Sequence, residues 1–288
     1  MEKRIITTDA IAAFKKALIE NEKSEATIDK YVRDVTVFME STEDAPITKD
    51  TVIAYKHKIA ELYAVRSVNS MLSSINSFFE FMEWYDCKVK TIKMQNEIYR
   101  SEEKDLTEDE YRALVKTAEN KGDIRLCLIL QTICSTGIRI GELSFITVRA
   151  AKRGEAIVKC KGKTRKVFLL PELCKLLLAY AEHNKILKGP VFLGKNGKPI
   201  HRTTVWREMK ALCKTTGIPA SKVFPHNLRH VFAKVFYKIE KDIAKLADIL
   251  GHSSINTTRI YIMTTGDEHR KKIEQMKLLL TSTPISVA

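Results

Sequence analysis

The sequence predicts a mainly α-helical protein of two domains, with one small β-hairpin in the second domain. Through most of the 288 residues, apolar side chains recur every three or four positions, which is the period of an amphipathic helix. This period is lost over residues 93–105, where the chain becomes polar, and we expect an interdomain linker there. One later interval departs from the helical pattern, because two short apolar runs flank a basic segment.

Residues 1–92 are expected to form a domain of four helices. Thr8 or Asp9 can cap the first helix, and Ser24 precedes the second. Pro46 interrupts the chain, after which Thr48 can cap the third helix. The fourth helix has an apolar stripe of the kind that is typical of a packed core, made of Val68, Met71, Leu72, Ile75, Phe78, Phe79 and Met82.

Residues 106–288 are expected to form a second, mainly helical domain. It opens with a capping box at Thr107 and Glu110, followed by an apolar helix near 123–136. Two strands, 156–158 and 167–170, are expected on either side of a basic turn. The other periodic segments predict helices over residues 171–187, 201–216, 226–239, 242–250, 256–262 and 267–280.

The formal charge of +14 is unevenly distributed along the chain. Residues 1–100 contain 15 lysines and arginines against 16 acidic residues, whereas residues 101–288 contain 34 against 19. Cationic side chains gain affinity for a polyanion by releasing its counterions, so the second domain is expected to bind nucleic acid. The alternative is that the charge serves solubility alone.

The composition indicates a globular protein of the cytoplasm. Hydrophobic residues make up 44% of the chain and charged residues 29%. No run approaches the roughly 18 apolar residues of a membrane span, and the first residues lack the apolar core of a signal peptide. The six cysteines form no Cys-x-x-Cys pair, which predicts reduced thiols.

Four segments of the second domain contain residues suited to chemistry, at 135–143, 159–166, 225–230 and 250–261. Taken singly, each has an ordinary structural explanation. A glycine such as Gly137 or Gly251 can end a helix. Tyr261 lies at helical spacing from apolar neighbours and is a candidate core residue.

The histidines of these segments also suggest a metal site. His226 and His230 have the spacing of a helical zinc site, with His252 as a candidate third ligand. Zinc hydrolases of the His-Glu-x-x-His type place their general base directly after the first histidine, where this chain has Asn227. Arg229 would also put a cation inside the site. We therefore expect no metal and no other cofactor.

Taken together, the four segments resemble the catalytic domain of the tyrosine recombinase family, which includes phage integrases and Xer-like recombinases. That family is recognised by Thr-Gly-x-Arg-x-x-Glu-Leu, a lysine on a β-hairpin, His-x-x-Arg, and Gly-His followed nine residues later by tyrosine. All of these are present in order, at Arg139, Glu142, Lys161 or Lys163, His226, Arg229, His252 and Tyr261. The resemblance is strong over residues 105–265. Over residues 1–90 it rests only on a four-helix domain where the family has its SAM-like core-binding domain.

The resemblance implies a DNA-cleaving site with Tyr261 as the nucleophile. Attack adds charge to the non-bridging oxygens of a phosphodiester, and two planar guanidiniums, Arg139 and Arg229, can stabilise that charge. His252 would donate a further hydrogen bond, and His226 is the candidate base for the tyrosine proton. The products are a 3′-phosphotyrosine and a free 5′-hydroxyl. Because the covalent bond keeps the phosphodiester energy, religation needs no ATP. No metal is needed either, because the arginines take the place that a cation would fill.

The hairpin is expected to supply the general acid that protonates the leaving 5′-oxygen. Family hairpins of the type Gly-Lys-Gly-x-Lys-x-Arg place this acid at the first lysine, which matches Lys161, and Lys163 is the alternative. Lys163, Arg165 and Lys166 are also candidate DNA-binding residues. Glu142 is expected to orient its basic neighbours rather than to react.

The family implies double-stranded DNA with inverted half-sites as the substrate. A homo-tetramer, or a hetero-tetramer with a paralogue, would act on two sites and exchange strands through a Holliday junction. Each chain would close round the duplex as a C-shaped clamp, in the cytoplasm at the nucleoid. The last helix would dock on a neighbouring protomer, or pack on its own domain, through Ile273, Met276, Leu279 and Leu280.

Two other functions fit part of the same pattern. A type IB topoisomerase uses a similar set of residues to relax supercoils and needs no defined site. A DNA-binding protein on a degenerate integrase fold would lack part of the set, whereas six functional positions are intact here. Among recombinases, the sequence does not separate a mobile-element integrase from a resolver of chromosome or plasmid dimers.

Overall fold

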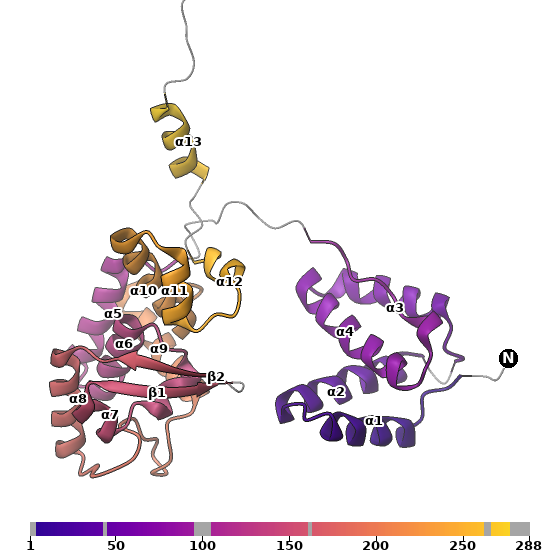
Figure 1. Ribbon diagram of the computed structural model, residues 1–288, viewed down its shortest axis with the longest axis horizontal. Helices are drawn as coiled ribbons and strands as arrows, with labels where there is room; N and C mark the ends of the chain where they lie inside the picture. Colours follow the sequence, from indigo (N-terminus) through magenta and orange to yellow (C-terminus); the bar gives the residue numbers. More distant parts are fainter. Residues whose placement is uncertain (1–3, 43–44, 95–104, 161–162, 262–265, 277–288) are drawn as a thin grey trace, which may run out of the picture. The chain divides into compact units, whose positions relative to one another are not determined.

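The computed structural model describes residues 4–42, 45–94, 105–160, 163–261 and 266–276. This part of the chain is mostly helical with a single two-stranded sheet, so the predicted fold class is confirmed (Figure 1). The chain divides into two compact units, Met1–Asn96 and Glu97–Ala288, and the division falls within the segment predicted as a linker. The last residue of that segment, Asp105, is buried and accepts a hydrogen bond from Nζ of Lys234 at 2.6 Å, so it is part of the second unit.

The helices of the first unit are α1 (Thr8–Glu20), α2 (Glu25–Thr42), α3 (Lys49–Leu62) and α4 (Val65–Phe81), followed by the short 3-10 helix η1 (Tyr85–Cys87). Thr48 caps α3 as predicted, because its side chain accepts a hydrogen bond from the backbone N–H of Thr51. The cap of α1 is Thr7 rather than Thr8 or Asp9. Thr7 has an extended backbone and its hydroxyl accepts from the N–H of Ala10, so the helix begins one residue earlier than the predicted caps allow.

The apolar stripes of these four helices form a core within the first unit. Phe38 of α2 and Phe79 of α4 are fully buried, and their ring centroids lie 5.9 Å apart in an edge-to-face arrangement. Phe14 of α1 and Phe78 of α4 make a second such pair at 5.3 Å. Burying a side chain of this kind contributes roughly 1.5–3 kcal/mol, so the unit has the hydrophobic core expected of an independent domain.

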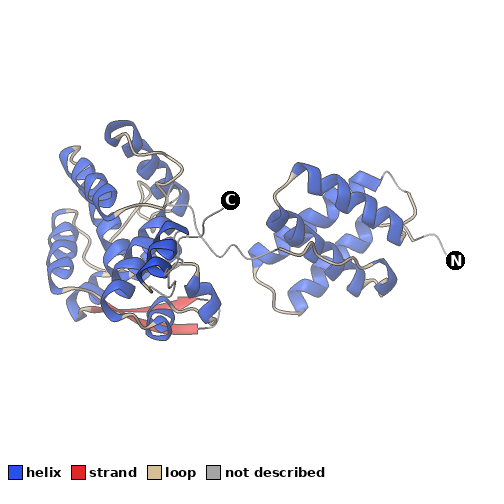
Figure 2. Ribbon diagram, turned by 90° about the horizontal axis from the view of Figure 1, so that it is seen from above, coloured by secondary structure: helices blue, strands red, loops and turns tan. Residues whose placement is uncertain are grey.

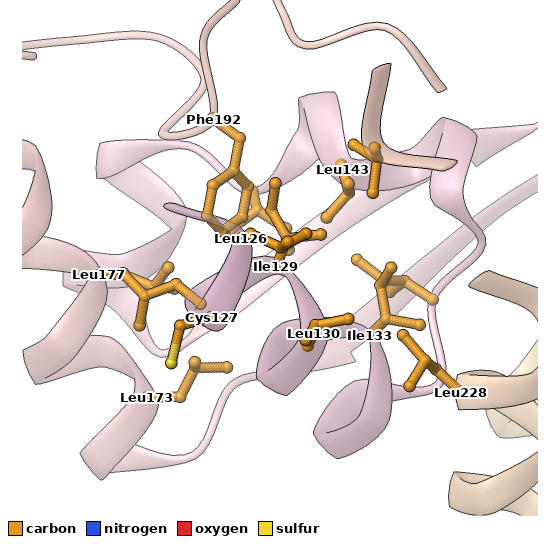
Figure 3. Packing of buried hydrophobic residues seen from close by; sticks show 14 of the residues in the cluster. Leu126, Cys127, Ile129, Leu130, Ile133, Leu143, Leu173, Leu177, Phe192 and Leu228 are labelled. Atoms are coloured by element: carbon orange, nitrogen blue, oxygen red, sulfur yellow. The ribbon is translucent and has the colours of Figure 1, made fainter. Parts of the chain in front are cut away.

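The second unit is built round α6 (Ile124–Thr136), a helix whose side chains are buried on nearly every side. Figure 3 shows Ile129, Leu130 and Ile133 of α6 among apolar side chains of other elements. Leu177 belongs to α8 (Pro171–His183) and Leu228 to α10 (Pro225–Glu240). A helix that is apolar all round is a core helix, and α6 therefore fixes the position of the segment that follows it.

The other predicted helices of the second unit are present with small shifts of their ends. α5 (Glu108–Asn120) begins at the predicted capping box of Thr107 and Glu110. Two short elements, η3 (Ile140–Phe145) and α7 (Val148–Arg153), were not predicted, because six residues are too few for a periodic signal. The remaining helices are α9 (Arg202–Thr216), α11 (Ile243–Leu250), α12 (Ile255–Arg259) and α13 (Gly266–Gln275).

The hairpin consists of β1 (Glu155–Cys160) and β2 (Lys163–Phe168), which pair antiparallel from Glu155 opposite Phe168 to Cys160 opposite Lys163 (red in Figure 2). The strands are longer than predicted, because the ladder continues through most of the basic segment that was expected to be a turn. Opposite residues share a face of the sheet, so Arg165 lies on the same face as its partner Val158. Val158 is buried, and this register therefore directs Arg165 toward the interior.

Ile273 of the final helix, α13, and Met276 directly after this helix are exposed. Leu279 and Leu280, the other two members of its predicted stripe, lie outside the described residues. The docking of this helix on a neighbouring protomer stays a prediction. Among the described residues, no helix is both long enough and apolar enough to cross a bilayer.

Candidate active site

The first catalytic candidate follows the end of α6. Gly137 closes this helix with φ +64°, a left-handed conformation that side chains rarely adopt. A Cβ added there would lie 2.5 Å from a ring carbon of Phe232 and 2.9 Å from Leu250. Glycine is therefore required for both the turn and the packing. Two residues later, Arg139 is the N-cap of η3, and its side chain is 37% exposed.

Glu142 holds Arg139 in place from inside the fold. Its carboxylate is buried and accepts the backbone N–H of Arg139 at 2.7 Å and the Nη1 of the same residue at 3.2 Å. Arg165 of β2 binds the same carboxylate with both terminal nitrogens, at 2.9 and 2.7 Å. Burial alone would raise the pKa of Glu142, but the hydrogen bonds from Arg165 and Arg139 outweigh it, so that the pKa is lowered and the carboxylate is charged.

Arg165 also touches the segment that precedes His252. Gly251 ends α11 with φ +67°, and a Cβ there would lie 2.9 Å from Cδ and from Nη1 of Arg165. Arg165 thus lies between the η3 segment and the end of α11. Its sequence context predicts a DNA contact, whereas its side chain is only 14% exposed and forms an ion pair with Glu142.

Arg229 is the largest fully buried side chain of the described chain, with 1% of its surface exposed. Its Nη1 donates to the carbonyl of Gly137, and its Nη2 donates to the carbonyl of Leu250 at 2.7 Å and to Nε2 of His252 at 2.9 Å. Burial, and after it the charge of Arg139, lowers the pKa of Arg229 to about 10. The guanidinium is still protonated at neutral pH and joins the ends of α6 and α11.

His252 is held from both sides of its ring. Nε2 accepts from Arg229, and Nδ1 lies 2.8 Å from the hydroxyl of Thr258. Burial, and then the positive charges of Arg229 and Arg139, lowers the pKa of His252 to about 4, so the ring is neutral at pH 7. Since a guanidinium can only donate, Nε2 is the acceptor and Nδ1 has the proton.

Tyr261 lies just beyond α12 and is 4% exposed. Its hydroxyl is 3.3 Å from Nε2 of His226. Three imidazoles surround the phenol ring, with centroid distances of 4.2 Å to His230, 5.4 Å to His252 and 5.4 Å to His226. His226 itself is exposed, so it faces both the solvent and the phenol. Among the described residues, no group of acidic, histidine or cysteine side chains is placed to hold a metal ion.

The hairpin residues are only partly described. Lys161, the predicted general acid, lies outside the described residues. Lys163 pairs with Cys160 through its backbone in the ladder. Lys166 makes an ion pair with Glu155 at 2.9 Å, with its side chain 52% exposed.

The structure thus brings together Arg139, Glu142, Arg229 and His252, with Tyr261 against His226. The sequence analysis did not predict two contacts of this cluster. These are the hydrogen bond between Thr258 and His252, and the ring contact between His230 and Tyr261.

Comparison with known proteins identifies the class to which this fold and site belong. A model of the phage integrase family matches residues 104–267, and a model of the phage integrase N-terminal SAM-like domain matches residues 11–85. Tyrosine recombinase XerA of Pyrococcus horikoshii is 30% identical over 289 residues, which cover 96% of this chain and 96% of that protein.

Two solved structures have a similar fold. The XerH site-specific recombinase bound to palindromic difH substrate has a TM-score of 0.72 and 18% identity, and covers 87% of this chain and 79% of that one. A lambda integrase tetramer bound to a Holliday junction has a TM-score of 0.70 and 19% identity, and covers 88% of this chain and 76% of that one.

The chain belongs to the phage integrase family of tyrosine recombinases. It is an enzyme of site-specific DNA recombination, which cleaves and rejoins DNA strands.

Proposed function

We propose that Tyr261 is the nucleophile that attacks the scissile phosphate and forms a 3′-phosphotyrosine. The observation that supports this most directly is the 3.3 Å separation between its hydroxyl and Nε2 of His226. A phenol must lose its proton to attack, and a histidine at this distance is suited to accept that proton. The phosphorus–O5′ bond breaks as the Oη–phosphorus bond forms, and the number of phosphodiester-type bonds does not change.

The two arginines are proposed to stabilise the charge that develops on the non-bridging oxygens. Arg139 is partly exposed and can reach a phosphate from the surface. Arg229 is buried, and among the described residues its Nε–H has no hydrogen-bond partner, so this N–H is available to a phosphate oxygen. His252 would add a further hydrogen bond from Nε2.

Glu142 and Arg165 are proposed to act through Arg139 rather than on DNA. The bidentate bond between them holds the carboxylate that in turn accepts from Arg139. Lys163 and Lys166 remain the candidate DNA contacts of the hairpin. Lys161 is proposed as the acid that protonates the departing 5′-oxygen, with Lys163 as the alternative.

The proposed substrate is double-stranded DNA with inverted half-sites. The XerH recombinase, bound to palindromic DNA, and lambda integrase, a tetramer on a Holliday junction, are the relatives that support this. The assembly would be a homo-tetramer, or a hetero-tetramer with a paralogue, on two sites in the cytoplasm at the nucleoid. Residues 1–92 would act as the core-binding domain, and the reaction would serve a mobile element or the resolution of DNA dimers.

The test of this function is the covalent adduct. A nicked suicide duplex carrying the recombination site should trap the wild-type protein as a band of reduced mobility on a denaturing gel. Tyr261→Phe should bind the same duplex and form no adduct. Tyr237→Phe is the matched control, because Tyr237 packs against the same apolar cluster as Tyr261. An adduct formed by the Tyr261 variant would show that another residue is the nucleophile.

A further inference from the structure

Thr258 is the one side chain that contacts Nδ1 of His252 among the described residues, and it is fully buried. Its hydroxyl lies 2.8 Å from Nδ1, and its backbone carbonyl accepts the N–H of Tyr261 at 2.9 Å. One residue of α12 is therefore bonded to both the histidine and the candidate nucleophile.

The hydrogen bonds around His252 conflict with the role that the reaction requires of it. In the free protein Nε2 accepts from Nη2 of Arg229, so Nε2 has a lone pair and no proton. A histidine that stabilises a phosphate oxygen must donate from that same nitrogen. His252 must therefore exchange its protonated nitrogen, or gain a second proton, when the phosphate arrives.

A hydroxyl at Nδ1 is the partner that permits this exchange without a second proton. A carboxylate or a carbonyl at this position could only accept and would fix the proton on Nδ1, whereas a hydroxyl can accept or donate by rotation. In the free protein the Thr258 hydroxyl accepts from Nδ1–H, and its own proton has no partner among the described residues. When Nε2 donates to a phosphate, the same hydroxyl can donate to Nδ1, and every polar group of the pair is then satisfied.

We propose that Thr258 is a positioning residue that lets neutral His252 change from a hydrogen-bond acceptor in the free enzyme to a donor at the scissile phosphate. The inference rests on the proposed role of His252. The charged groups that face this ring are Arg229, Arg139 and Arg165, with His226 nearby, and all of them oppose a second proton on it. Transfer of the proton from Nδ1 to Nε2 leaves the net charge of the site unchanged.

The tautomer can be observed directly by 15N NMR of protein labelled at its histidines, with His252 assigned by loss of its signals in His252→Asn. The free protein should have a protonated Nδ1 and an unprotonated Nε2. In Tyr261→Phe bound to the nicked duplex, the pattern should be reversed. Protonation of both nitrogens in the complex, or of Nε2 in the free protein, would overturn the proposal.

Cleavage by three variants separates positioning from folding. Thr258→Val keeps the branched shape but removes the hydroxyl, and adduct formation should slow by about 10- to 100-fold, as when a partner that orients a functional histidine is lost. Thr258→Ser should restore most of the rate. Thr257→Val is the control, because Thr257 is adjacent and exposed. Thermal unfolding of Thr258→Val would reveal a folding defect. Even then, the 15N signal of Nδ1 in the free variant should show that its hydrogen bond to the hydroxyl is lost.

The outcomes also separate this proposal from the function on which it rests. If wild-type protein forms no adduct with the duplex, the proposed function fails. If the wild type forms the adduct and Thr258→Val forms it at the same rate, the role of Thr258 is wrong while the function stands.

Discussion

Arg165 binds Glu142 with both terminal nitrogens, Nη1 to Oε1 at 2.9 Å and Nη2 to Oε2 at 2.7 Å. This pair joins the β-hairpin to the segment that begins with Arg139. The carboxylate is buried and accepts from both arginines, so its charge is necessary for the arrangement of the site. A change in that charge is expected to alter both stability and activity.

The first prediction concerns the pH dependence of this pair. The pKa of Glu142 is lowered in the folded protein, so its stabilising effect is present above the ordinary glutamate pKa of about 4.3 and is lost as the pH falls through the lowered value. Glu142→Gln should reduce the free energy of unfolding at pH 7 by up to about 3–5 kcal/mol, the cost of breaking a buried ion pair.

The change in unfolding free energy can be measured by denaturant unfolding of both proteins between about pH 3 and pH 7, a range that includes the carboxylate pKa. The difference between wild type and Glu142→Gln should shrink at the acid end. Glu155→Gln is the control, because Glu155 pairs with Lys166 at the surface and should contribute only about 0–1 kcal/mol. A constant difference at every pH would mean that folding does not shift the pKa of Glu142.

The two arginines are predicted to differ in what their loss does to the fold. Arg139→Ala should slow cleavage on the order of a hundredfold or more, as the loss of an oxyanion stabiliser does. Its side chain is partly exposed, so the unfolding free energy should change by no more than about 1 kcal/mol. Single-turnover cleavage together with thermal unfolding tests this, and a near wild-type rate would exclude Arg139 from the phosphate.

Arg229→Ala should damage both activity and stability. It leaves the carbonyls of Gly137 and Leu250 without their donor, and each unpaired buried group costs about 1–3 kcal/mol. Single-turnover cleavage and thermal unfolding again test this prediction. A variant that cleaves poorly but unfolds like the wild type would contradict the structural role of Arg229.

The hairpin lysines can be distinguished by the leaving group. Lys161→Ala should severely impair cleavage of a normal phosphodiester, and Lys163→Ala should be milder. A 5′-phosphorothiolate should rescue the variant that lacks the acid, because the sulfur leaves without protonation. It should not rescue Tyr261→Phe, which lacks the attacking atom, or Arg139→Ala. Rescue of Lys163→Ala alone would assign the acid to Lys163.

Cleavage is predicted to persist in EDTA and without added nucleotide, since the arginines are proposed to supply the charge that a metal would otherwise provide. The measurement is adduct formation in the presence and absence of chelator, with magnesium or zinc restored afterwards. A strict requirement for either metal would revive a metal role for His226, His230 and His252.

Much of the fold and of the candidate site was predictable from the sequence, because helix caps and helix-ending glycines agree with the overall fold. The capping box at Thr107 and the glycines that end α6 and α11 are at the expected positions. The inward direction of Arg165 was also encoded. Arg165 and Val167 lie two residues apart in β2, so their side chains point to the same face of the sheet, and Val167 is buried. The positive charge of Arg165 nevertheless suggested a DNA contact. Alternation along the strand therefore predicts the direction of this side chain, which its charge does not.

Other features had no local signal. The contact between Thr258 and His252 depends on the way the chain turns after Gly251, and no periodicity specifies that turn. The ring contact between His230, in α10, and Tyr261, just beyond α12, joins two segments that are distant in sequence. The proton position on His252 follows from Arg229, which approaches from α10. Such features appear only when tertiary packing is known.

The ring of Tyr261 is part of an apolar cluster with Leu246 and Leu250, and the proposed chemistry needs only its oxygen. A spontaneous change to phenylalanine would therefore leave a folded subunit without activity. In a cell that makes both forms, such a subunit would compete for the same DNA and enter shared complexes. The mutant allele would be dominant over the intact one, so losing a single oxygen atom would be genetically more harmful than losing the whole gene.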